Sequence, residues 1–171
     1  MKELLQQSAA YNVWANQQLV EAVLRLPEDL QTKETPSSFP GLHRTILHLW
    51  DAGSIWWQRL KLQEVVIPPS LHFNGITRDA ANGLVHQDKL WESWVNQATE
   101  TALQHVFAYQ NSKKEHFKQP MYQALYHLFN HSTYHRGQIV TMFHQLGVTK
   151  IPNTDFIGWA RNTTKRHPQT P

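Results

Sequence analysis

The sequence has 171 residues with 40% hydrophobic and 17% charged residues and a net charge of +3, which suits one globular domain and excludes a disordered chain. Because the chain has no cysteine, it supplies no disulfide, thiolate ligand or thiol nucleophile, and its dispersed lysines and arginines make a nucleic-acid partner unexpected. It has no run of about 18 apolar residues and no signal-like start, so we expect a cytoplasmic protein that neither spans a membrane nor is exported.

Two long amphipathic helices are predicted in the first part of the chain. Small and apolar residues recur in steps of four and three over residues 4–26, and Pro27 marks the end of this helix. Ser37 and Ser38 are candidate N-caps for a second helix over residues 38–62. The next segment reads VVIPPSLHFNGIT, and its paired prolines and its glycine predict a long connection of the kind that permits a crossover in a bundle.

Two more helices and a ribbon are predicted in the second part. A third helix covers about residues 79–105, with its apolar residues on one side. Aromatic residues on both sides of an Asn-Ser-Lys-Lys turn then predict a short two-stranded β-ribbon. The last helix starts at Pro120 and runs to about Leu146, where Gly147 supplies a C-terminal stop.

These elements predict an all-α fold, namely a four-helix bundle with a long crossover connection and a short β-ribbon before the last helix. We expect a single bundle domain over residues 1–160 and a flexible tail over residues 161–171. The last helix also carries apolar residues away from its histidines. Such a two-sided helix needs a second partner, which predicts a homodimer.

The histidines are the unusual feature of the composition, since the chain has eleven of them. His131 and His135 lie four residues apart on the predicted last helix, so their side chains share one face. Eleven histidines placed at random give roughly 0.6 pairs at this spacing, and His127 forms a second pair with His131. The alternative interpretation is therefore that these residues are ordinary core or surface histidines that bind no metal.

A zinc-like ion rarely binds tightly to two ligands, so a third ligand from another helix is needed. His48 is the candidate, because it lies in the middle of the predicted second helix among small and apolar neighbours. This helix is apolar nearly all round. Its periodicity therefore does not determine which way His48 faces.

Four segments, in order and spread over nearly the whole chain, resemble the DinB-like family of metal-dependent enzymes, the DNA-damage-inducible proteins related to bacillithiol transferases. They read YNVWANQQL, LHLWDAGSIWWQRL, LYHLFNHSTYHRGQI and LGVTKIPNTDFIGW. The resemblance implies a four-helix bundle, often homodimeric, with zinc or nickel held by three histidines that correspond to His48, His131 and His135. It makes His127 a residue of the surrounding pocket.

The sequence departs from the family pattern at Gly53, where many relatives have an acidic residue that would serve as a base or a fourth ligand. Asp51 and Glu64 are the nearest acidic residues in the sequence. Arg136 and Gln138, which follow His135 in the segment HRGQ, are candidates for binding substrate or orienting an imidazole, and they could equally be structural.

Three neutral imidazoles leave a metal ion its full positive charge and at least one open position. This chemistry favours a metal-dependent hydrolase of a small-molecule substrate, or a thiol transferase that uses a low-molecular-weight thiol cosubstrate. The thiol-transferase option agrees with the absence of cysteine, because the nucleophile would be the sulfur of the cosubstrate. The alternative is a non-enzymatic metal-binding or stress-related protein in which the ion ties two helices together.

Overall fold

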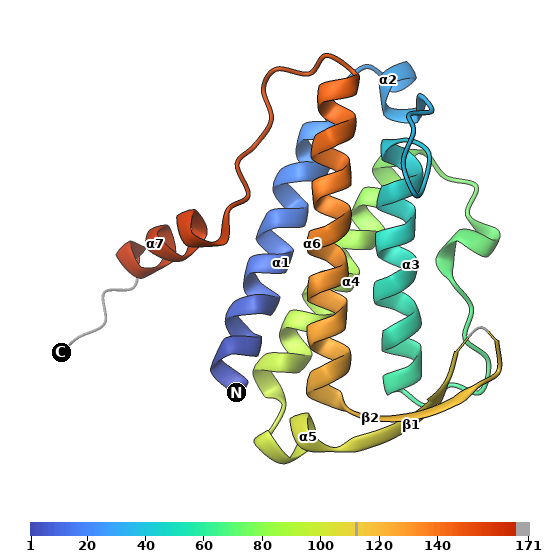
Figure 1. Cartoon of the computed structure of the whole chain (residues 1–171), viewed down its shortest axis with the longest axis vertical. Helices are drawn as coiled ribbons and strands as arrows, with labels where there is room; N and C mark the ends of the chain where they lie inside the picture. Colours follow the sequence, from blue (N-terminus) through green and yellow to red (C-terminus); the bar gives the residue numbers. More distant parts are fainter. Residues whose placement is uncertain (112, 167–171) are drawn as a thin grey trace.

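The structure is a computed structural model that describes residues 1–111 and 113–166. Four long helices form its body: α1 (Lys2–Leu24), α3 (Leu42–Leu60), α4 (Thr77–Gln97) and α6 (Met121–Gln145) (Figure 1). The shorter elements are α2 (Glu28–Thr32), the 3-10 helix η1 (Pro69–His72), α5 (Glu100–Gln104), β1 (Val106–Gln110), β2 (His116–Pro120) and α7 (Phe156–Arg166). The prediction of an all-α four-helix bundle is therefore confirmed.

The order of the helices around the bundle differs from their order in the chain. α1 and α3 each pack against both α4 and α6, so α1 and α3 occupy opposite corners. The connection between α3 and α4 runs back along the bundle, which makes these two neighbours parallel (Figure 1). This is the predicted crossover. With this connection, α3 runs antiparallel to α6 and packs against it (Figure 1). Residues of the second and the last predicted helices are therefore neighbours.

The predicted ribbon is also present. β1 and β2 pair antiparallel, with Val106 opposite Pro120 and Gln110 opposite His116. The ribbon curves round the end of the bundle where α3 finishes (Figure 1). Ser112, in the predicted turn, lies outside the described residues.

The bounds of two predicted helices were wrong. α3 begins after Gly41, whose φ of 99° and approach to the Lys33 carbonyl suit glycine, so neither Ser37 nor Ser38 caps this helix. The predicted third helix ends at Gln97, because the next residue is extended and the Thr99 hydroxyl accepts a hydrogen bond from the Ala102 N–H to start α5. The predicted helix was too long because hydrophobic periodicity gives no information about the Thr99 cap that starts a new helix.

The predicted stop at Gly147 is confirmed. Its φ is 74°, and the Val148 N–H donates to the Phe143 carbonyl at 2.9 Å, which closes the end of α6 as in a Schellman motif. After this turn the chain leads to α7, which lies beside α1 with Phe156 and Trp159 against the ring of Tyr11.

The division into a domain and a tail stays a prediction. Residues 161–166 of the predicted tail belong to α7, and residues 167–171 lie outside the described part of the chain. Among the described helices, none combines the length and the apolar composition that a membrane crossing requires.

The interior consists of two apolar clusters with polar residues between them. One cluster centres on Leu19, Ile46 and Phe143, and the other on Trp91 and Leu125. Between them along the bundle axis lie buried polar side chains from three helices: Asn12 and Asn16 of α1, Asp88 of α4, and Ser132, His135 and Arg136 of α6. The middle of α6 therefore carries polar groups toward more than one neighbouring helix.

Candidate metal centre

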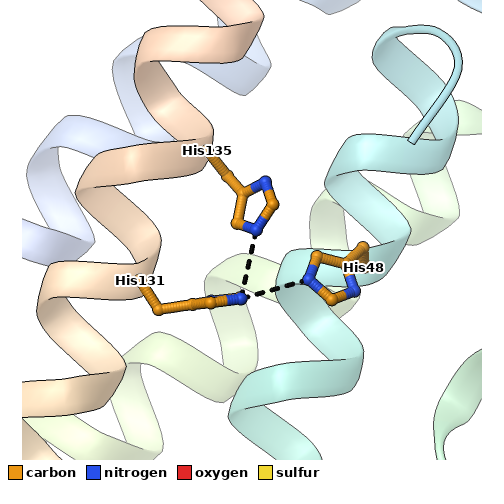
Figure 2. A group of neighbouring side chains, drawn as sticks. All are labelled: His48, His131 and His135. Carbon is orange, nitrogen blue, oxygen red and sulfur yellow. Dashed lines mark hydrogen bonds between the residues drawn. The ribbon is translucent and has the colours of Figure 1, made fainter. Parts of the chain in front are cut away.

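Three histidine side chains meet where α3 packs against α6. His131 and His135 stand one turn apart on α6, and His48 reaches them from α3 (Figure 2). The Nε2 atom of His131 lies 3.1 Å from Nε2 of His48 and 3.1 Å from Nε2 of His135. One nitrogen from each ring lies within 4.8 Å of the other two. The direction of His48, which the sequence leaves open, is therefore toward the other two rings.

The surroundings of the cluster exclude water from part of it. His135 is 3% exposed, and the other two rings are half-buried. The ring of Phe39, in the loop before α3, stacks on His48 with centroids 3.7 Å apart and an interplanar angle of 15°. Phe39 also contacts the edge of His135. Sequence reasoning missed this residue, because a single aromatic in an irregular loop carries no periodic signal.

The protonation state of the rings favours cation binding. Burial, followed by the neighbouring histidines, lowers the pKa of His48 and of His131 to about 4. Burial also lowers the pKa of His135, although its hydrogen bond to Gln138 opposes this shift. All three imidazoles are consequently neutral at pH 7, the form that binds metals.

Gln138 determines the tautomer of His135. The two side chains share a 2.7 Å hydrogen bond between Nδ1 and Oε1, while the amide nitrogen of Gln138 donates to the Ser38 hydroxyl at 2.8 Å. Because an amide oxygen only accepts, Nδ1 of His135 carries the proton. Its Nε2 then presents a lone pair to the cluster. Gln138 thus orients an imidazole, one of the roles considered from the sequence.

Hydrogen bonds among the three rings cannot satisfy all of their Nε2 atoms. A neutral ring nitrogen either donates one hydrogen or accepts one, so Nε2 of His131 cannot form two good hydrogen bonds to the other rings. A cation bound to all three lone pairs satisfies them together. Tetrahedral zinc with bonds of 2.0–2.1 Å needs nitrogens about 3.3 Å apart. The two distances from Nε2 of His131, each 3.1 Å, are close to this value, and all three ligand nitrogens lie within 4.8 Å of one another. The residues therefore fit a divalent metal ion.

The other acidic and histidine candidates lie outside the three-histidine group. His127 is exposed, with its ring centroid 5.7 Å from that of His131 and 5.6 Å from that of Trp56. The Asp51 carboxylate accepts the Ser70 N–H at 2.8 Å and so anchors η1 to α3. Glu64 follows α3 and lines a separate pocket. None of these three joins the cluster.

The departure at Gly53 does not remove a group from the cluster. A Cβ atom at this position would lie 2.9 Å from Cγ of Gln87 and 4.0 Å from the indole nitrogen of Trp91, both on α4. The Gly53 carbonyl also accepts a 3.0 Å hydrogen bond from Trp91. A side chain at position 53 would therefore start toward α4, whereas the three histidines lie between α3 and α6.

Arg136 points into the bundle and away from the cluster. It is 3% exposed, and its guanidinium donates to Oδ1 of Asn12 at 2.7 Å and to Oδ1 of Asn16 at 3.1 Å. The amide nitrogens of the same asparagines donate to the two carboxylate oxygens of Asp88 at 3.0 Å and 2.8 Å. The amides of Asn12 and Asn16 thus connect the buried guanidinium of Arg136 to the buried carboxyl of Asp88. Arg136 therefore has the contacts of a residue that stabilises the fold.

Replacing Gln138 by leucine is expected to weaken zinc binding about 10- to 100-fold, the usual cost of losing the partner that orients a histidine ligand. Leucine keeps the size of the side chain but leaves Nδ1 of His135 without its acceptor, so the ring can rotate or change tautomer. Competition with a zinc chelator measures the change. Thr141→Val, one turn further along α6, is the control and should bind zinc as the unmodified protein does; equal affinity for Gln138→Leu would contradict the role assigned to Gln138.

Comparison with known proteins identifies the family and the fold of the chain. The DinB family model matches residues 1–167. Protein DinB of Bacillus subtilis (strain 168) is 26% identical over 151 residues, which cover 85% of this chain and 87% of that protein. The crystal structure of a DinB-like protein from Bacillus cereus has the same fold, with a TM-score of 0.68 and 19% identity over 88% of this chain and 95% of that chain. The chain therefore belongs to the DinB family, as its sequence motifs indicate.

Proposed function

We propose that this protein binds a divalent metal ion, zinc or nickel, through His48, His131 and His135 and acts as a metal-dependent hydrolase or thiol transferase. The observation that supports this is the convergence of three neutral ring nitrogens within 4.8 Å. Within residues 1–111 and 113–166, no fourth histidine or carboxylate joins the group, so at least one position stays open to a ligand. A divalent cation supplies a Lewis acid that lowers the pKa of a water or a thiol bound to it.

The chain's own residues prepare the site for such chemistry. Gln138 holds His135 with its lone pair toward the cluster, and Phe39 covers one face of His48. Although His127 is exposed, the partial burial of its ring and the nearby Arg59 lower its pKa, so this imidazole is neutral at pH 7 beside His131. His127 is therefore available to contact a substrate at the edge of the site.

The absence of cysteine bears on the thiol-transferase option. The sulfur nucleophile would come from a low-molecular-weight thiol cosubstrate, since the chain has none of its own. The resemblance to bacillithiol transferases supports this option, and the open coordination position supports either. In both the hydrolase and the thiol-transferase option, the substrate would be a small molecule.

The competing function is a non-enzymatic metal-binding or stress-related protein. One observation favours it: the ligands come from two different helices, so an ion would join α3 to α6. A structural ion stabilises the native state by mass action, so its removal should strongly lower the melting temperature. An open catalytic ion contributes less to stability and exchanges small ligands.

Removing the metal tests the proposal. We expect the zinc-loaded protein to accelerate either hydrolysis of an activated aryl ester or displacement of chloride from 1-chloro-2,4-dinitrobenzene by the thiol of free cysteine, which gives the thioether, chloride and a proton. Chelation should return the rate to the uncatalysed level, and added zinc should restore it. Equal rates with and without metal would exclude metal-dependent catalysis. No acceleration in either assay, together with a large fall in melting temperature on chelation, would favour the non-enzymatic function.

We further propose a cytoplasmic homodimer. Exposed aromatic residues on α6 support the dimer, since Tyr126 is 71% exposed and Tyr134 is 61% exposed on the outer side of this helix. Sedimentation equilibrium measures the assembly state.

A further inference from the structure

A second cavity lies at the end of α3 remote from Phe39. It has a volume of about 650 Å³ and is walled by the last turns of α3, the connection after it and the end of β1. Its lining includes Ile55, Arg59, Gln63, Glu64, Gln110 and Asn111. The ribbon and this connection approach each other beside the lower end of α3 (Figure 1). We call this cavity the Arg59 pocket.

Arg59 is a cation without a counterion. Its guanidinium carbon lies 4.7 Å from the ring centroid of Trp56 and 5.0 Å from that of Tyr109. Its Nε is buried and has no hydrogen-bond partner. In the described part of the chain, no carboxylate lies within 4.0 Å of it. Cation–π contacts position the charge, but they leave the donors of the guanidinium fork available.

Two residues with positive φ lie close in the sequence to lining residues of the Arg59 pocket, although neither lines the pocket itself. Leu62 has φ 53° and Lys114 has φ 63°, and across residues 1–111 and 113–166 these are the two non-glycine residues with positive φ. The Leu62 N–H donates to the Arg59 carbonyl, and the Lys114 N–H donates to the Asn111 carbonyl, each at 3.1 Å. Positive φ at Leu62 belongs to the turn that ends α3, and positive φ at Lys114 belongs to the turn of the ribbon, so two hydrogen-bonded turns border the pocket.

We propose that the Arg59 pocket binds a small organic molecule through one anionic group, a carboxylate or a phosphate. The fork of Arg59 would pair with two oxygens of this group, which recovers the cost of desolvating an unpaired cation. The amides of Gln63, Gln110 and Asn111 offer hydrogen bonds to the rest of the ligand, and Ile55 and the valines beside Glu64 offer apolar contact.

Glu64 narrows the class of ligand. Its carboxylate lines the same pocket, so it repels a second negative charge and attracts an amine. The ligand is therefore a monoanion or a zwitterion, and a polyanion such as a nucleic acid is disfavoured. This inference goes beyond the metal-dependent function, because no residue of the three-histidine cluster lines the pocket.

Titration with small probes tests the proposal. Inorganic phosphate, acetate and glycine are added at constant ionic strength while the backbone amide shifts of Gln63, Gln110 and Asn111 are followed by NMR. We expect at least one probe to produce saturable shifts with a dissociation constant on the order of millimolar, as suits so small a ligand. The probe that binds most tightly distinguishes phosphate, carboxylate and zwitterion recognition.

Three variants control the assignment. Arg59→Met should weaken binding at least tenfold, whereas Arg44→Met, on the same helix but outside the pocket, should leave it unchanged. Should Arg59→Met fail to fold, Glu64→Gln tests the same electrostatics at an exposed position and should tighten anion binding about threefold. Absence of saturable shifts with every probe, or equal affinity in both pocket variants and the unmodified protein, would overturn the proposal.

The same titration in chelated and zinc-loaded protein separates this inference from the proposed function. Equal probe affinity is expected in both forms, because none of the three ligand histidines lines the pocket. A protein that binds no zinc but still binds the probe would remove the metal proposal alone.

Discussion

Replacing His135 by alanine is expected to lower zinc affinity by more than about 100-fold, a larger loss than removing a partner that only orients a ligand. The variant keeps two ring nitrogens, and two protein ligands rarely hold a zinc-like ion tightly. His48→Ala should produce the same loss, although this residue lies on another helix and far away in the sequence. Elemental analysis of purified protein and isothermal titration with zinc measure the effect.

His144→Ala is the matched control for this prediction. His144 lies on the same helix as His135, two and a half turns further on, but it is exposed and outside the cluster. Its removal should leave the metal content unchanged. Equal metal content in His135→Ala and the unmodified protein would leave the proposed activity without a centre, whereas a loss limited to His135→Ala and not seen in His48→Ala would restrict the site to α6.

The largest stability effect is expected from Arg136→Met. Removing one partner of a buried charged network leaves the other unpaired and typically costs about 3–5 kcal/mol. Here the amide oxygen of Asn12 would lose its donor, that of Asn16 would keep only the Ser132 hydroxyl, and Asp88 would lose the nearby positive charge. Denaturant unfolding measures the change. Arg44→Met removes only an exposed ion pair with Glu34 and should cost less than about 1 kcal/mol.

The cost of Arg136→Met should also depend on pH. Burial raises the pKa of Asp88 to about 7, against the hydrogen bonds from the two asparagines and the attraction of Arg136. The native state therefore keeps a proton that the unfolded chain loses above its ordinary pKa of about 4, so this group lowers the free energy of unfolding as pH rises from about 4 to about 7. Without Arg136 this loss extends to higher pH.

Unfolding at two pH values separates the contributions of charge and packing. Arg136→Met should be more destabilising at pH 8, where Asp88 of the unmodified protein is ionised and attracted by Arg136, than at pH 5, where Asp88 is protonated. Adding Asp88→Asn should remove most of this difference. A cost that is the same at both values would mean that Arg136 acts through packing and neutral hydrogen bonds, and not through its charge.

Local features of the fold were predictable because helical geometry relates sequence spacing directly to space. A spacing of four residues puts His131 and His135 on one face whatever surrounds them, and Gly147 ends α6 because only a residue tolerant of positive φ closes that turn. The ribbon followed from aromatic residues on both sides of a turn. The resemblance of the motifs to one family added the three-histidine set, which spacing alone left open.

Tertiary packing decided the rest. His48 lies on a helix that is apolar nearly all round, so its direction depends on which neighbour covers each face, and the crossover that makes α3 antiparallel to α6 turns it toward His131. Arg136 stands next to His135 in the sequence yet points to a different helix, because adjacent residues on a helix are about 100° apart. Phe39 reaches the cluster from a loop whose path no periodicity describes. The sequence by itself determined the helices and the paired histidines of α6, since these depend on local geometry, whereas the meeting of three rings from two helices depends on contacts between residues 83 positions apart.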